Sequence, residues 1–112
     1  LVSSCKEKMS NRMETEATKQ LLSTYDEVSK QQTELSKLKQ TDRAAYREGM
    51  KQLRQKYNMR EHGRMKRYKH DMKLLTEKYL RSKSAEERDS LVRVMTTTRD
   101  KLLDDIGRMN QQ

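Results

Sequence analysis

Apolar side chains recur along the first two-thirds of the chain at steps of three and four residues, the spacing of one face of an α-helix. In the middle, four tyrosines stand 11 residues apart, with methionine and leucine between them. Eleven residues make three turns at about 3.67 residues per turn, so these side chains share one face. This face, which we call the seam, is predicted to comprise Met9, Met13, Leu21, Tyr25, Val28, Leu35, Tyr46, Met50, Leu53, Tyr57, Tyr68, Met72, Leu75 and Tyr79.

The seam predicts one long helix. Counting back by 11 from Tyr46 reaches Leu35 and Met13 without a slip, so we expect a coiled-coil segment in residues 1–80. Its helix should cover most of residues 5–80, about 110 Å at 1.5 Å per residue. Near the middle, Glu61 and Arg64 occupy expected seam positions. Three interpretations fit, in order of preference: a polar layer of a coiled coil, a kink at the nearby glycine, and a reversal within residues 58–63.

A second interruption is predicted at residues 81–85. Residues 81–90 contain no large apolar side chain, and Ser84 followed three residues later by Glu87 has the form of a capping box. We therefore expect a break or bend there, followed by a short amphipathic helix over 86–112. That helix either continues the rod or folds back on it. Its apolar positions are predicted to be Leu91, Val94 or Met95, Thr98, Leu102, Ile106 and Met109.

Composition agrees with an all-α, elongated coiled coil. Of the 112 residues 31% are hydrophobic and 38% are charged, which is too little apolar surface for a compact core. Proline is absent and glycine numbers three, which favours helix over disorder. No run of 18 apolar residues predicts a membrane span. The single Cys5 fits a reducing compartment. We expect a segment of a larger intracellular protein, located in the cytoplasm, with association with the cytoskeleton as a further option.

The positive charge is concentrated in one stretch. The net charge is +9, and residues 42–83 carry 14 basic and 5 acidic side chains. In a parallel, in-register homodimer, basic residues beside the seam face each other, so either the partner segment is acidic or staggered, or a polyanion lies along the rod. Around a single helix these side chains point in nearly all directions, whereas a nucleic acid or a membrane is usually met by one stripe. The candidate residues for binding an acidic partner are Arg47, Lys56, Arg67, Lys69 and Lys78.

Residues suited to catalysis or metal binding do not form a pattern. His62 and His70 stand eight residues apart without cysteine or paired carboxylates at ligand spacing, and we expect both to be exposed among lysines and arginines. The sequence has no glycine-rich phosphate loop and no nucleophile with a base at a recognisable spacing. We predict no enzymatic activity, no cofactor and no metal, and we find no specific resemblance to a family.

Two functions follow from these patterns. The first is a coiled-coil segment that mediates oligomerisation, scaffolding or binding of a partner protein, as a homodimer or a hetero-oligomer through the seam. The alternative is a basic rod that attaches electrostatically to an acidic surface. That surface is an anionic membrane, an acidic polymer tail or a nucleic acid.

Overall fold

A computed structural model describes residues 15–111 of the chain, and in that part every regular element is an α-helix. The helices are α2 (Glu16–Ser36), α3 (Arg43–Lys56), α4 (Met59–Arg81) and α5 (Ala85–Asn110). The expectation of an all-α chain is therefore confirmed for the described residues.

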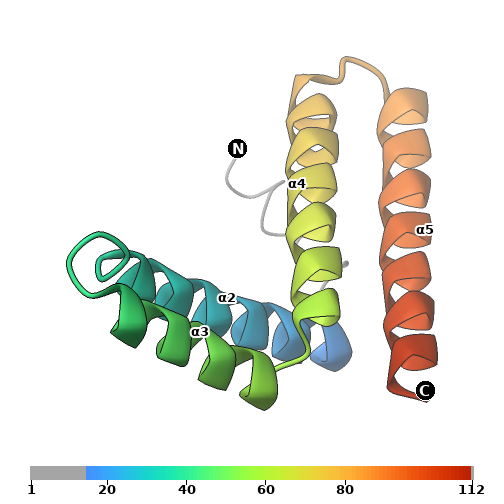
Figure 1. The fold of residues 1–112 in the computed structure, drawn as a ribbon. Helices are drawn as coiled ribbons and strands as arrows, with labels where there is room; N and C mark the ends of the chain where they lie inside the picture. The colour runs from blue at the N-terminus through green and yellow to red at the C-terminus, as the bar shows by residue number, and fades with distance from the viewer. Residues whose placement is uncertain (1–14, 112) are drawn as a thin grey trace.

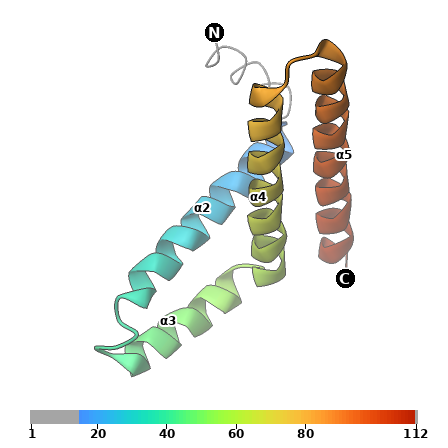
Figure 2. The ribbon, with the colours of Figure 1, turned by 90° about the horizontal axis from the view of Figure 1, so that it is seen from above.

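The helices form two antiparallel pairs. α2 and α3 make one hairpin, and α4 and α5 make a second hairpin that stands at a steep angle to the first (Figure 1). Seen from above, the α2–α3 hairpin extends away from the other pair, while the beginning of α2 lies against α4 (Figure 2). The principal extents are 55 × 33 × 17 Å. The longest of these is about half the length of the rod expected from the sequence.

The expectation of a single helix through residue 80 is wrong, because the chain turns at 37–41 and again at 57–58. Each turn ends at a residue that caps the next helix. The side chain of Asp42 accepts a hydrogen bond from the backbone N–H of Ala45, and that of Asn58 accepts from those of Arg60 and Glu61. Such caps satisfy N–H groups that a helix start leaves unpaired, which stabilises two new helices in place of one continuous one.

In the middle of the predicted rod the chain changes from one helix to the next. The chain changes direction at Tyr57 and Asn58, ahead of Gly63, which lies inside α4. Arg64 does reach another helix, but one of its own chain: its Nη1 lies 3.5 Å from a carboxylate oxygen of Asp105 in α5. The change of direction is therefore a break between two capped helices. It is neither a polar layer in one helix nor a kink at glycine, and the chain does not reverse within 58–63, because residues 59–63 already belong to α4.

The break expected within residues 81–85 lies between α4 and α5. Ser84 caps α5 by accepting a hydrogen bond from the backbone N–H of Glu87, as the sequence indicated. Nη1 of Arg88 also donates to the carbonyl oxygen of Ser82 across the turn, at 3.3 Å. After this turn α5 folds back along α4, which settles the alternative that the sequence left open (Figure 1).

The core lies where three of the helices meet. One cluster of buried side chains joins α4 and α5, and residues of α2 pack against it. The buried members are Met65, Tyr68, Leu102 and Ile106, with Leu21, Leu22, Tyr25 and Met72 packed around them. A second cluster surrounds Met95, which is fully buried, whereas its neighbour Val94 is 46% exposed. Of the two alternatives in the sequence, Met95 therefore takes the inward position.

The α2–α3 hairpin requires a glycine at one close approach. A Cβ atom at Gly49 would overlap Cδ2 of Leu35 on α2, whereas a Cβ at Gly63 would meet nothing within 4 Å. Replacing Gly63 with alanine should raise the free energy of unfolding by about 0.8–1 kcal/mol, because alanine loses less backbone entropy in a helix. At Gly49 the same gain in the free energy of unfolding is offset, because the new Cβ displaces the Leu35 side chain. Thermal unfolding of the two variants measures the difference, and equal stabilisation of both would contradict the Gly49–Leu35 contact.

Candidate functional site

The seam residues that the structure describes turn largely inward within one chain. Val28, Leu53 and Tyr68 are buried. Others pack against the two core clusters, namely Leu21, Tyr25, Met72, Leu75 and Tyr79. A third group stays partly exposed on α2, on α3 and in the turn after α3: Leu35, Tyr46, Met50 and Tyr57. Met9 and Met13 lie outside the described residues. The seam thus supplies an intramolecular core, and whether it also joins two chains stays a prediction.

Two inward residues were missed by the 11-residue count. Met65 is 1% exposed, yet the count assigned its stretch of helix to Glu61 and Arg64. Its spacing of three to Tyr68 and seven to Met72 was the available signal. Thr18 is also 1% exposed. It forms a reciprocal capping box with Thr15, in which each threonine hydroxyl accepts a hydrogen bond from the other residue's backbone N–H.

The junction of α2 with α4 gathers the most varied polar chemistry in the described part of the chain. The ring of His62 stacks on that of Tyr25, with centroids 4.6 Å apart and planes inclined by 17°. Nε2 of His62 lies 3.1 Å from Oγ of Ser29. Beside this stack Lys69 lies 5.2 Å from the centre of the Tyr25 ring and 3.4 Å from a carboxylate oxygen of Asp26. The junction therefore ties the two hairpins together.

The expectation that His62 is exposed is wrong, since its side chain is partly buried against α2. Burial lowers the pKa of His62 below its ordinary value of 6.5, and the positive charge of Lys66 lowers it further. Sequence reasoning missed this because the partners, Tyr25 and Ser29, lie more than 30 residues earlier in the chain. His70 is exposed, as expected.

The Ser29–His62 contact pairs a hydroxyl with an imidazole, and a small cavity lies beside His62. The cavity between α2 and the start of α4 has a volume of about 20 Å³, which holds one water molecule. It is lined by Leu21, Thr24, Tyr25, Val28, Tyr57, Asn58, Glu61, His62 and Met65. The stacked and hydrogen-bonded His62 is suited to holding α2 and α4 together.

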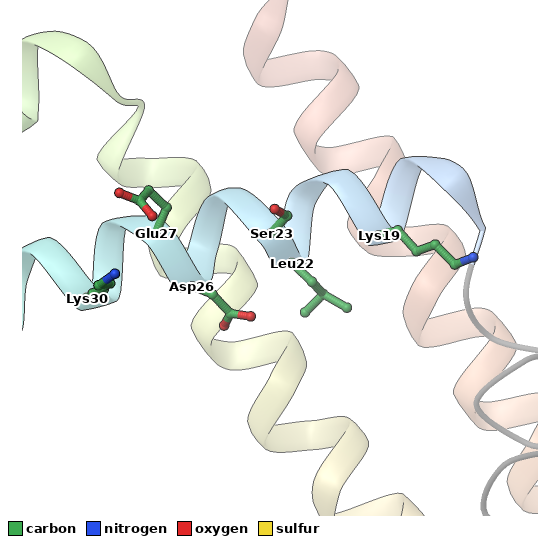
Figure 3. Close-up of a pocket in the computed structure, with 6 residues that line it drawn as sticks. All are labelled: Lys19, Leu22, Ser23, Asp26, Glu27 and Lys30. Carbon is green, nitrogen blue, oxygen red and sulfur yellow. The ribbon is translucent and has the colours of Figure 1, made fainter.

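A second, open depression lies along the outward face of α2 (Figure 3). The side chains around it follow one helix and do not converge on a common point (Figure 3). They are Lys19, Leu22, Ser23, Asp26, Glu27 and Lys30. Because two basic and two acidic groups line it, the depression favours neither an anion nor a cation.

The basic residues of 42–83 form the most extensive chemical feature of the surface. All fourteen are exposed. Within residues 15–111 only Arg64 and Lys69 of this set make an ion pair, with Asp105 and Asp26 respectively. α3 carries five basic and one acidic side chain, and α4 carries eight basic and three acidic. In contrast, α2 carries two basic and four acidic, and α5 five basic and six acidic. Each hairpin therefore pairs a basic helix with a weakly acidic one.

The predicted acidic-partner residues are distributed over both basic helices. Arg47 lies in α3 and Lys56 ends it, with its Nζ 5.4 Å from the centre of the Tyr57 ring. Arg67, Lys69 and Lys78 lie in α4. The column in which Lys56 precedes Arg67 and Lys78 by steps of 11 is broken, because Lys56 belongs to another helix. Lys69 already forms an ion pair with Asp26 of its own chain.

The described residues contain no group of three or more histidine, cysteine or acidic side chains placed to hold a metal ion. None of their helices is long and apolar enough to span a membrane.

Comparisons of the chain with protein-family models, with curated proteins and with solved structures find no match. Its function is therefore argued from its own geometry and charge.

Proposed function

We propose that the chain is a non-enzymatic helical binding module that attaches to an acidic partner through the exposed basic side chains of α3 and α4. The observation that supports this is the set of fourteen exposed basic residues in 42–83, of which two have an acidic partner in the described chain. A surface of one sign attracts an oppositely charged partner and accelerates its association. We propose a cytoplasmic location for the module.

The spacing of the charges adds to the argument, because it costs stability. Arg43, Arg47 and Lys51 follow one another at i, i+4 on α3, and each such like-charged pair destabilises a helix by about 0.2–0.5 kcal/mol. These three charges do not face the acidic helix α2, because α3 packs on α2 through its other side. An acidic partner removes this repulsion when it binds.

Oligomerisation through the seam is the second candidate. It is favoured by seam residues that keep part of their surface exposed on the α2–α3 hairpin, namely Leu35, Tyr46, Met50 and Tyr57. It ranks below the first because most of the seam already contacts the core of its own chain. A homodimer or a hetero-oligomer with an acidic chain would bury the remainder. An increase in mass with concentration in sedimentation distinguishes this candidate.

Charge reversal tests the first candidate. Replacing Lys56, Arg67 and Lys78 with glutamate changes exposed positions only, so the helix content in circular dichroism should stay the same. We expect the affinity for polyglutamate, for phosphatidylserine vesicles or for a nucleic-acid duplex, whichever the unaltered chain binds, to fall at least tenfold. That affinity should also weaken as salt is added, because screening shortens the range of the attraction.

The matched control reverses the same number of charges elsewhere, at the exposed Lys19, Lys30 and Lys101. These residues lie on α2 and α5, so this variant should keep most of the affinity. If the unaltered chain bound none of the three acidic ligands at low salt, the basic surface would be only a solvated face and the proposal would fail.

A further inference from the structure

Four basic residues of α3 form a single stripe. Arg43, Arg47, Lys51 and Arg54 follow one another at steps of four, four and three, so they share an arc of about 80° at 100° per residue. The stripe is about 16 Å long at 1.5 Å per residue. All four side chains are exposed, and none makes an ion pair within the described residues. The one acidic residue of α3, Glu48, lies outside this arc.

The side of α3 that packs on α2 is separate from the stripe. Leu53, 3% exposed, marks that side, and the partly buried Tyr46, Gly49 and Met50 lie around it. The stripe is therefore free of the contacts that hold the hairpin together, and α3 can present it to a partner without unfolding.

The large apolar side chains of α3 are buried or only partly exposed, and this indicates what kind of partner fits the stripe. In residues 15–111 the exposed large hydrophobic side chains are Leu38, Leu74 and Val94, and none of them lies on α3. Interfaces between proteins have an apolar core in which charged residues are depleted. A helix that lies in a membrane surface inserts bulky apolar side chains beside its basic face. The stripe offers neither, whereas phosphate groups need only cations and N–H donors.

The burial of the tyrosines favours a duplex over a single strand as the partner of the stripe. Proteins that bind single strands stack the bases on exposed aromatic rings. The chain has neither phenylalanine nor tryptophan, and each of its five tyrosines is buried or partly buried. A duplex keeps its bases stacked inside and presents its phosphates. An α-helix 10–12 Å wide also fits a DNA major groove about 12 Å wide.

From these observations we infer that α3 binds the phosphate backbone of a nucleic-acid duplex through Arg43, Arg47, Lys51 and Arg54. This inference rests on the proposed function and specifies its partner. Three of the four residues are arginines, whose planar guanidinium groups pair with phosphate oxygens through two parallel hydrogen bonds. Because backbone contacts carry no sequence information, the binding should tolerate any base sequence.

The sequence alone argued against this partner, because basic side chains surround a helix that runs from residue 42 to residue 83. That argument depended on one continuous helix. The break at Tyr57 and Asn58 separates α3 from α4, and within α3 four of the five basic residues lie in the stripe.

The test measures fluorescence anisotropy of labelled 20-base-pair duplexes of DNA and of RNA at 50 to 200 mM salt. Each phosphate contact contributes a slope of about −0.9 to log K against log salt for a DNA duplex. Four contacts predict a slope of about −3.6 or steeper, a loss of roughly 100-fold across this range. The DNA and RNA measurements show which duplex the α3 stripe accepts.

Two variants with the same loss of charge locate the binding. In the first, Arg43, Arg47, Lys51 and Arg54 are replaced with glutamine, which should make the DNA slope shallower by about 3.6 units. In the second, the same change is made at Lys19, Lys30, Lys37 and Lys101, exposed residues outside the stripe. The second variant should keep a slope of at least −3. Circular dichroism shows that both remain helical.

Equal weakening in both variants would overturn the inference, because binding would then follow net charge alone. If the unaltered chain bound polyglutamate or phosphatidylserine vesicles but neither duplex, the inference would fail while the proposed attachment to an acidic partner stood. If it bound none of these polyanions, both would fail.

Discussion

Replacing Met65 with alanine is expected to lower the free energy of unfolding by about 2–5 kcal/mol. Met65 is 1% exposed and lies in the cluster where α4 meets α5 and α2, in contact with groups from all three helices. Truncating it leaves a cavity that three helices would have to close together. Because a domain of this size is stable by only about 5–15 kcal/mol, the loss is a large fraction of the total. Denaturant unfolding followed by circular dichroism measures it.

Leu74 supplies the matched control on the same helix. Its side chain is 45% exposed, so the alanine variant should stay within about 0.5 kcal/mol of the unaltered chain. Alanine favours helix at both positions, so helix propensity does not account for the difference. If both variants lost the same stability, Met65 would not be a core residue, and the packing of α2 across α4 and α5 would be wrong.

Small-angle X-ray scattering should give a radius of gyration near 17.3 Å for the chain at low concentration. A single rod of about 110 Å would give about 32 Å, and a compact domain of 112 residues about 13 Å. The intermediate value follows from two hairpins that meet at one end instead of packing side by side (Figure 2). The difference from the rod is almost twofold, well above the error of the measurement.

Repeating the scattering at several concentrations and at low and high salt separates shape from association. A radius that stays constant indicates the folded single chain. A radius near 30 Å at all concentrations would restore the extended helix. An increase with both concentration and salt would support pairing through the seam, with basic flanks that repel each other until they are screened.

Local signals in the sequence located several helix ends, and others were overlooked. Ser84 followed by Glu87 correctly placed the start of α5, because a capping side chain acts on N–H groups two or three residues away. Asp42 and Asn58 cap their helices in the same way. Their significance was masked by the continuous 11-residue spacing of the tyrosines. An apolar periodicity shows which face of each helix is buried, but it does not show that the helix is unbroken.

Part of the candidate binding surface was visible in the sequence. Arg47, Lys56, Arg67 and Lys78 were identified as exposed cations, which requires only their charge, since such groups are rarely buried without partners. The pairing of Lys69 with Asp26 was not visible, because 43 residues separate them and only the contact of α2 with α4 brings them together. The one-sided stripe on α3 was hidden for a related reason, since its arc exists only once α3 ends at Lys56.

The sequence by itself determined the helical class, the inward residues of most turns and the concentration of positive charge, because these depend on composition and on neighbours within a few residues. Only the tertiary structure decided what covers the apolar face. A seam of Tyr68, Met72 and Leu75 is buried equally well by a second chain or by α5 of the same chain, and local spacing does not distinguish the two. Three capped turns bring the covering helices within reach, so one chain covers most of its own seam and leaves its cations outside.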